Sequence, residues 1–199
     1  MKYTGPKVKR SRRVGIPLTR KATKWMDRKP GVAGMHRSRF TKKVSDYGRQ
    51  LLEKQKLCFQ YNITDRKLQN YYHKASAKHG NTGTNLMHML ESRLDALVLR
   101  AGFAPTIYAA RQIVGHGHVQ VNGKRVNIPS FLVRPGSTLT IKVKSRALDI
   151  VKNAIPDAQS VPYLTVDKEG VTAMYTRLPE INEIPVICEV AVVVEFYAK

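Results

Sequence analysis

The sequence predicts an α+β protein in which a basic extended N-terminal arm and an α-helical domain precede a small helix-and-sheet module. Three observations predict this class. Apolar residues recur at helical spacing between residues 47 and 114. Short alternating or β-branched runs, bounded by turn residues, dominate from residue 119 onward. The charge is uneven, because residues 1–80 hold 22 Lys and Arg against 4 Asp and Glu, whereas residues 151–199 carry a net charge of −3.

These patterns divide the 199 residues into four parts. We expect a basic N-terminal extension over residues 1–44, an α-helical domain over 45–90, an αα-hairpin-plus-β-sheet module over 91–155 and a C-terminal mixed β segment over 156–199. The last part is expected to pack on the others. The length allows one large or two small domains, and a hydrophobic fraction of 42% is sufficient to form their cores.

The first 44 residues carry 15 Lys and Arg and a single acid, Asp27. Gly and Pro interrupt them repeatedly, and their apolar residues follow neither a helical nor a strand period. Such a segment cannot bury enough apolar surface to offset its ordering entropy. We therefore expect an extended arm that orders when its charges meet phosphates. The alternative is a basic tail that only improves solubility.

Three helices are expected next. Ser45-Asp46 provides an N-cap for a helix over 47–60, and Thr64 with Asp65 begins a second helix that ends near Gly80. Thr84 caps a third helix that is predicted to continue to Ala101. The core face of this third helix comprises Leu86, Leu90, Leu94, Leu97 and Val98.

The module continues with a short helix and a hairpin. Thr106 can cap a helix that ends at Val114. Asn122-Gly123 is the strongest short hairpin signal in the chain, so residues 119–121 and 124–128 are predicted to pair as strands. A further strand is expected over 138–143, after a turn at 134–137.

The last quarter of the chain is predicted to contain one helix and three strands. The helix spans 145–155 and is stopped by Pro156. Strands over 163–166 and 171–178 flank a turn at 167–170. The run VAVVVEFY at 190–197 is rich in β-branched residues and predicts a buried strand.

Composition excludes several classes of protein. No apolar run approaches the roughly 20 residues of a membrane span, and the charged N-terminus lacks the apolar region of a secretory signal. The two cysteines, Cys58 and Cys188, have no partner at metal-ligand spacing and are expected to be free thiols. No nucleophile elbow, phosphate loop or Cys/His pair indicates catalysis. We expect no enzyme activity, no cofactor and no metal.

The net charge of +21 indicates a polyanionic partner. No carboxylate lies between Asp95 and Asp149, although basic residues recur there. His116-Gly117-His118 could chelate a metal, present imidazoles and glycine backbone to a phosphate, or form a turn without a ligand. We favour the phosphate, because glycine lets a nucleic-acid backbone approach closely.

Several motifs resemble one family. SRLDALVLRAGFA, ARQIVGHGHVQVNGKRV and VRPGS, within residues 91–141, resemble the RNA-binding module shared by the S-four ribosomal protein, many pseudouridine synthases and some tyrosyl-tRNA synthetases. MKYTGPK, SDYGRQLLEKQKL, NTGTNLMHMLESRLD and the final EFYAK resemble landmarks of the S-four ribosomal protein family itself. This resemblance covers essentially the whole chain.

The resemblance implies a structural protein of the small ribosomal subunit. It would bind the 5′ domain of small-subunit ribosomal RNA early in assembly, lie near the place where messenger RNA enters, neighbour the S-five protein and influence translational accuracy. It implies a cytoplasmic ribosome, or an organellar one, with no membrane and no homo-oligomer. Many members carry four N-terminal cysteines that bind zinc or an iron–sulfur cluster. Residues 1–57 contain no cysteine, so the chain resembles the metal-free variant.

The predicted RNA-binding residues are basic, aromatic or polar side chains in all parts except the C-terminal one. They are Lys7, Lys9, Arg10, Arg12, Arg13, Arg37, Arg39, Lys42, Lys43, Tyr47, Arg49, Lys54, Lys56, Arg66, Arg93, Arg111, Gln112, His116, Gly117, His118, Asn122, Lys124 and Arg125. Basic residues near 37–43 are implied to face messenger RNA. The acidic end of the chain is expected to contact a protein neighbour through Glu183, Glu189, Glu195 and Tyr197, and deleting residues 183–199 is expected to leave RNA affinity largely intact.

Two other functions share this module. An RNA-modifying enzyme would need a separate catalytic domain of roughly 100–200 residues, and the rest of this chain is too short and too basic for one. A stand-alone RNA chaperone or ribosome-rescue factor is opposed by the long basic arm and by the landmark motifs at both ends. Co-sedimentation with small subunits after a high-salt wash would distinguish a subunit protein from such a factor.

Overall fold

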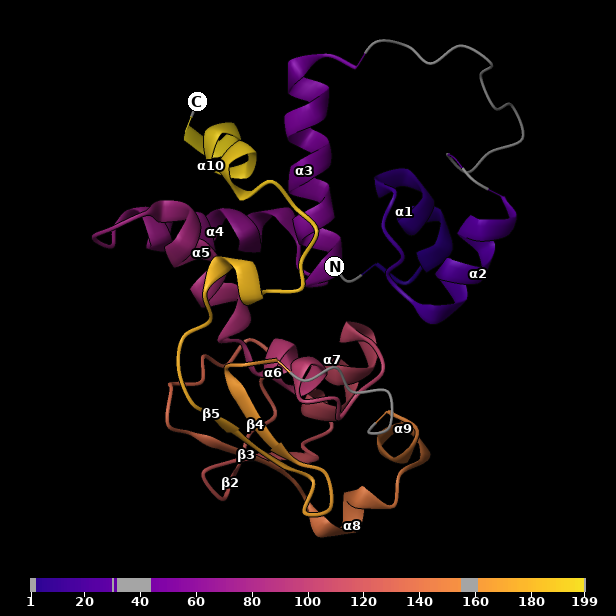
Figure 1. Ribbon diagram of the computed structural model, residues 1–199, viewed down its shortest axis with the longest axis vertical. Helices are drawn as coiled ribbons and strands as arrows, with labels where there is room; N and C mark the ends of the chain where they lie inside the picture. Colours follow the sequence, from indigo (N-terminus) through magenta and orange to yellow (C-terminus); the bar gives the residue numbers. More distant parts are fainter. Residues whose placement is uncertain (1–2, 30, 32–43, 155–160, 199) are drawn as a thin grey trace. The chain divides into compact units, whose positions relative to one another are not determined.

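The computed structural model describes residues 3–29, 31, 44–154 and 161–198, and the chain forms two compact units (Figure 1). The first, called unit 1, comprises residues 1–77 and 186–199, and unit 2 comprises residues 78–185. These units have different boundaries from the four parts expected from the sequence, which remain a prediction. The predicted α+β class is confirmed, because helices accompany a five-stranded antiparallel sheet.

Unit 1 begins with two helices where the sequence predicted an extended arm. They are α1 (Lys7–Val14) and α2 (Arg20–Arg28). The expectation was wrong because a few apolar side chains, Val14, Ile16 and Ala22, become buried although they follow no long period. Gly15 ends α1 with φ of 74°, a conformation that favours glycine.

Two longer helices follow and agree with the sequence. The hydroxyl of Ser45 accepts the N–H of Gly48 at the start of α3 (Asp46–Gln60), as an N-cap does. The next helix, α4 (Asp65–Ser76), buries Leu68, Tyr72 and Ala75. The inward face of α3 also carries polar side chains, namely Gln50, Glu53 and Lys54, which are buried with Leu57 and Cys58.

The strand predicted over residues 190–197 is wrong. This segment forms a helix, α10 (Val190–Ala198), which packs against α3 and α4 within unit 1 (Figure 1). β-Branched residues lower helix propensity only slightly, so packing can override their preference for strands. Val193 at the centre of α10 is fully buried.

Unit 2 begins with two helices rather than the single helix predicted over residues 84–101. They are α5 (Thr82–Glu91) and α6 (Leu94–Arg100). Arg93 between them is extended, with φ −70° and ψ 140°, and pairs with Leu132 in an isolated bridge. The N–H of Leu94 then donates to the carbonyl of Phe131 at 2.9 Å. A distant loop therefore takes over backbone bonds that a continuous helix would have made.

The helix predicted from Thr106 is α7 (Ile107–Gly115), with the Thr106 hydroxyl accepting the N–H of Ala109. The strands are β1 (Val119–Val121), β2 (Lys124–Arg125), β3 (Thr138–Ile141), β4 (Leu164–Asp167) and β5 (Thr172–Tyr175). They form one sheet in the order β2-β1-β3-β5-β4, with every neighbouring pair antiparallel. The strands expected around the turns at 122–123 and 167–170 are thus present, and β2 and β5 are shorter than predicted.

The core of unit 2 lies between the sheet and the pair α6 and α7. Leu97 and Val98 of α6 and Ile113 of α7 belong to the same buried cluster as Leu139 and Tyr175 of the sheet. Two short helices, α8 (Val143–Arg146) and α9 (Asp149–Lys152), replace the single helix predicted from Ser145. A 3-10 turn, η2 (Ile181–Glu183), precedes the return of the chain to unit 1.

Candidate nucleic-acid interface

The hairpin of unit 2 presents two cations on a short, rigid turn. Lys124 and Arg125 make up β2, and both side chains are exposed. Asn122 and Gly123 have φ of 49° and 77°, which are the left-handed values that a tight hairpin of this kind requires. The Asn122 carboxamide oxygen accepts the N–H of Thr138 at 2.8 Å, which ties the turn to β3.

The loop after α7 lies beside this hairpin. Gly117 has φ of 73° and is covered by the guanidinium of Arg125, so that a Cβ at this position would collide with it. Arg125 also donates to the carbonyl of His116 at 3.4 Å. The ring centroids of His116 and His118 lie 5.9 Å apart. The structure therefore brings both histidines and Arg125 together. Gln112 on α7 is exposed.

Sequence reasoning missed three further members of this region. Lys142 follows β3, and its N–H donates to the carbonyl of His118 at 2.9 Å. Ser145 on α8 places its hydroxyl 2.8 Å from Nδ1 of His118. Lys144 on α8 is exposed. The signal was the sequence KVKSR at 142–146, which is dense in cations but was interpreted only as the end of a strand and the start of a helix.

Arg93 and Arg111 do not lie on an open surface, contrary to the prediction. Arg93 is fully buried, and its Nη2 and Nε donate to the Asp95 carboxylate at 2.5 and 2.9 Å. The side chain of Arg111 is 11% exposed and donates to the same carboxylate at 3.2 Å. Asp95 is itself fully buried. Because the single Asp95 carboxylate pairs with both guanidiniums inside the unit, Arg93 is corrected from an RNA contact to a buried partner of Asp95, and Arg111 offers a partner only a small exposed fraction.

Glu91, like Asp95, is a buried carboxylate with an arginine partner. Glu91 is fully buried, and Arg100 donates to it at 2.8 Å. The Tyr163 hydroxyl also donates to Glu91 at 3.1 Å, and burial followed by the charge of Glu91 raises the pKa of that phenol. Glu91 and Asp95 are thus each engaged by arginine, which favours a structural role for both carboxylates.

Some cations of α1 are exposed, whereas others make contacts within unit 1. Lys9 and Arg13 are exposed. The guanidinium of Arg10 instead lies 3.5 Å from the centroid of the Tyr3 ring and 4.4 Å from that of Phe59, which joins α1 to α3. The other two predicted contacts on this helix, Lys7 and Arg12, bond to the carbonyls of Tyr3 and Gly31 at 2.6 and 2.8 Å and remain partly exposed.

The cations of α3 and α4 are not equally accessible. Tyr47, Arg49 and Arg66 are exposed, and Lys56 is partly exposed. Lys54 is buried, pairs with Asp65 at 3.0 Å and lies 4.4 Å from the Phe196 ring centroid. Its prediction as an RNA contact is therefore corrected, because its charge is used to dock α10.

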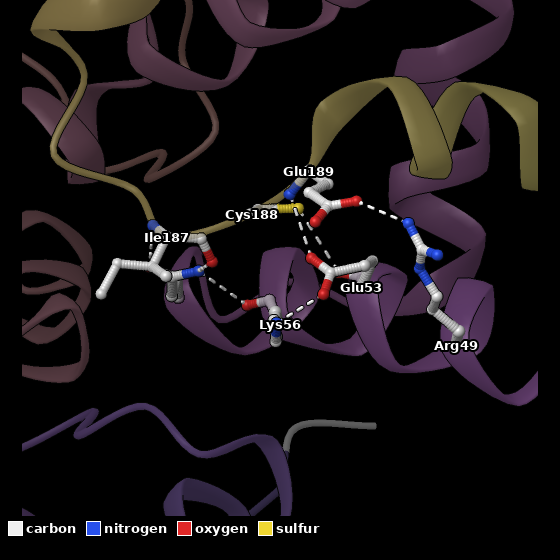
Figure 2. Close-up of polar contacts among 7 residues, drawn as sticks. Arg49, Glu53, Lys56, Ile187, Cys188 and Glu189 are labelled. Atoms are coloured by element: carbon white, nitrogen blue, oxygen red, sulfur yellow. Dashed lines mark hydrogen bonds and ion pairs between the residues drawn. The ribbon is translucent and has the colours of Figure 1, made fainter. Parts of the chain in front are cut away.

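Residues predicted to contact a protein neighbour instead make contacts within their own unit. Figure 2 shows Glu189 beside α3, where its N–H donates to Glu53 at 3.0 Å and its carboxylate pairs with Arg49 at 3.2 Å. The Tyr197 hydroxyl donates to Asp65 at 2.8 Å. Glu183 in unit 2 accepts from Arg177 at 2.8 Å, and Glu195 is exposed on α10. Of the four, Glu189 and Glu195 are exposed.

Four predicted contacts, Arg37, Arg39, Lys42 and Lys43, lie outside the described residues. Among the residues that the structure describes, no group of three His, Cys, Asp or Glu side chains could hold a metal ion. In the same residues, no helix is both long and apolar enough to cross a membrane. Cys58 and Cys188 are free thiols, as the sequence predicted.

Two family models match the chain: "Ribosomal protein S4/S9 N-terminal domain" over residues 2–91 and "S4 domain" over residues 92–139. Small ribosomal subunit protein uS4 of Geobacillus sp. (strain WCH70) is 46% identical over 199 residues, which cover 100% of this chain and 99% of that protein. Proteins with the same name from Chlorobaculum tepidum and Thermobifida fusca are 45% and 41% identical, cover 100% of this chain, and are themselves covered to 99% and 100%.

Proposed function

The chain belongs to the uS4 family of small ribosomal subunit proteins, and on this premise we propose that it binds small-subunit ribosomal RNA directly through both units. Its family consists of structural proteins of the ribosome and not of enzymes, so the chain is a structural component that serves translation.

The observation that carries the proposal is the arrangement of cations around the hairpin of unit 2. Lys124 and Arg125 project from β2 beside His116 and His118, and residues 96–148 contain no carboxylate. The cations that are buried in the same unit are paired with acids, as Arg93 is with Asp95. Cations left exposed without acids attract phosphates, which supply most of the affinity of proteins for nucleic acids.

Unit 1 supports the same proposal through its own exposed cations. Lys9 and Arg13 on α1, Arg49 on α3 and Arg66 on α4 are all exposed. Because these side chains stand on helices, they can contact the sugar-phosphate backbone at fixed positions. Recognition would then depend on the shape of the RNA and on its 2′-hydroxyls more than on base sequence.

We further propose that the chain binds the 5′ domain of the RNA and nucleates its assembly. It would lie near the place where messenger RNA enters, beside the S-five protein, and influence translational accuracy. The outer face of α10 supports a protein contact, because this helix has one charged residue, Glu195, and an apolar remainder that is only partly covered. We place the chain as a single copy on cytoplasmic ribosomes, with an organellar ribosome as the alternative.

The direct test is the binding of the purified protein to a 5′-domain fragment of small-subunit ribosomal RNA at several salt concentrations. The double variant Lys124→Ala/Arg125→Ala is expected to bind more weakly and to reduce the slope of log K against log salt by roughly 1.5, if each cation neutralises one phosphate. Lys168→Ala is a matched control, because Lys168 is exposed at the turn between β4 and β5. Equal affinities and slopes for all three proteins would contradict the proposal for this surface.

A further inference from the structure

Four basic side chains from separate segments of unit 2 gather around the loop at Gly117. His116 and His118 flank the glycine, Arg125 of β2 covers it, and Lys142 follows β3. The loop is held in place by backbone bonds, since the N–H of Gly117 donates to the carbonyl of Val114 at 2.8 Å and the carbonyl of His118 accepts from Lys142. We call these four side chains the histidine cluster.

No described acidic side chain forms an ion pair with any member of the histidine cluster. This distinguishes the cluster from Arg93, Arg100, Arg111 and Arg177, which are each paired with a carboxylate in the same unit. Like charges held this close repel one another, and a buried or partly buried site weakens screening by water. An arriving anion would relieve that repulsion.

The environment of His118 shows the effect of this repulsion. Burial lowers the pKa of its imidazole, and the charges of His116, Lys142 and Arg125 lower it further. These three residues and the neutral hydroxyl of Ser145 are the polar groups that face the ring. In the free protein the His118 imidazole is therefore largely neutral near pH 7. A bound phosphate would be attracted more strongly to the charged imidazole than to the neutral one.

We propose that the histidine cluster binds a phosphate of the RNA together with a proton, so that RNA affinity rises as the pH falls from 7.5 to 5.5. This inference rests on the proposed function and adds its regulation by protons. The direction of this pH dependence follows from the thermodynamic linkage between proton binding and RNA binding. A bound phosphate favours the charged imidazole and raises its pKa, so the complex takes up protons between the free and the bound pKa and is stabilised at the lower pH.

A purely structural role is the competing explanation for His118. Its ring is held by Ser145 at 2.8 Å and could simply fill the space between the loop and α8. That role predicts no proton uptake when RNA binds. His116 provides an independent member of the cluster, because its side chain is exposed and its replacement leaves the packing intact.

The test measures the affinity for a 5′-domain RNA fragment between pH 5.5 and 7.5 at constant ionic strength. We compare the unmodified protein with His116→Gln, with His116→Gln/His118→Gln and with Lys124→Ala. The unmodified protein is expected to gain up to about tenfold in affinity per pH unit for each proton taken up. The double variant should lose this gain, while Lys124→Ala should bind more weakly at every pH with the gain preserved. Changes in the RNA itself affect all four proteins equally.

A second measurement keeps the proposal testable if the double variant fails to fold. Nuclear magnetic resonance of the unmodified protein can follow the titration of the His118 imidazole, and its pKa is expected to rise when RNA is added. Equal pH dependence in the unmodified protein and the folded histidine variants, or an unchanged titration of His118, would overturn this inference but leave the proposed function intact. Absence of RNA binding at every pH would instead contradict the proposed function.

Discussion

The side chain of Gln60 donates to the carbonyl of Ile187 and accepts the N–H of the same residue, with both bonds at 3.1 Å. This reciprocal pair joins the end of α3 to a segment 127 residues later in the chain. The carboxylate of Glu53 on the same helix accepts the N–H of Glu189. The thiol of Cys188, which lies between Ile187 and Glu189 in the sequence, donates to the backbone carbonyl of Glu53 (Figure 2). The last residues therefore complete unit 1, although the sequence suggested that they were separable.

Ending the chain at Pro185 should destabilise unit 1, because α3 would lose its contacts with α10. The polar side chains of Gln50, Glu53 and Lys54, which are buried in the intact protein, would then be exposed. We expect faster hydrogen exchange at the amides of α3 and weaker RNA binding. This replaces the earlier expectation that RNA affinity is largely independent of residues 183–199. Unchanged protection of α3 in the shortened chain would contradict it.

A point substitution tests the same contact without removing the C-terminal segment. Gln60→Ala should lower the thermal midpoint of unit 1 by removing the two hydrogen bonds to Ile187, each worth about 1 kcal/mol, together with the bond from Gln60 to the carbonyl of Lys56. Ile187→Ala is the matched control, because it keeps the backbone groups that Gln60 binds and its own side chain is 63% exposed. Equal thermal midpoints for the two variants would contradict this contact.

Glu53 should make the stability of unit 1 depend on acidic pH. Burial alone would raise the pKa of this carboxyl, but hydrogen bonds from Lys56 and the Glu189 N–H lower it below its ordinary value near 4.5. A depressed pKa stabilises the fold above the unfolded value and this contribution is lost as the pH falls through the folded value. Glu53→Gln should therefore cost about 1–3 kcal/mol at pH 7 and progressively less below pH 4.5, in urea titrations at each pH. A constant difference between the two proteins across that range would refute the assignment.

The Asp95 carboxylate should be essential for the stability of unit 2. Asp95→Ala leaves the buried Arg93 charge without its carboxylate and weakens the position of Arg111, so we expect a loss of about 3–5 kcal/mol. Denaturant unfolding measures this loss. Lys124→Ala, on the exposed hairpin, should leave stability unchanged and reduce only RNA binding. Similar stability losses in both variants would show that Asp95 has no special role.

Gly117→Ala should destabilise the loop, whereas Gly115→Ala should not. Gly117 combines φ of 73° with contact to the Arg125 guanidinium, so an added methyl group brings strain of about 1–3 kcal/mol and displaces Arg125. A Cβ at Gly115, the last residue of α7, meets no atom within 4 Å. Thermal unfolding compares the two variants directly, and a Gly117→Ala protein as stable as the Gly115→Ala protein would argue against this geometry.

Both thiols should react slowly in the native protein. Burial first, and then the charges of Asp65 and Glu53 respectively, raise the pKa of Cys58 and of Cys188 to about 12. The reactive thiolate is therefore scarce at pH 8. Labelling with a thiol reagent should be slow until urea unfolds the chain, and Gln60→Ala should accelerate it. Rapid native labelling of both cysteines would contradict the packing of α10 on α3.

Local signals in the sequence predicted the elements whose stability is itself local. Ser45 and Thr106 cap their helices as expected, and Asn122-Gly123 forms the hairpin turn. Each of these depends on the hydrogen bonds or backbone angles of a few consecutive residues. The resemblance of the motifs to one family added the function, which the comparisons support at the level of the family.

Other expectations failed where distant segments decide the outcome. Residues 84–101 have continuous helical spacing, but the loop at 129–133 pairs with the backbone near Arg93 and divides the helix. The run at 190–197 has the composition of a strand, but its neighbours are α3 and α4, whose packing favours a helix. Neither neighbour can be recognised from the local spacing of apolar residues.

The sequence by itself determined the charge distribution, the caps at Ser45 and Thr106, the hairpin turn and the family, because each is encoded in neighbouring residues or in motifs. The cap predicted at Thr84 is instead Asn81. Only the tertiary structure decided which cations remain available. Arg93 and Lys54 carry the same charge as Lys124, yet the first two are buried beside carboxylates and the third is exposed. Desolvation makes a buried cation depend on its carboxylate partner, and the sequence alone does not specify which cations the fold will bury.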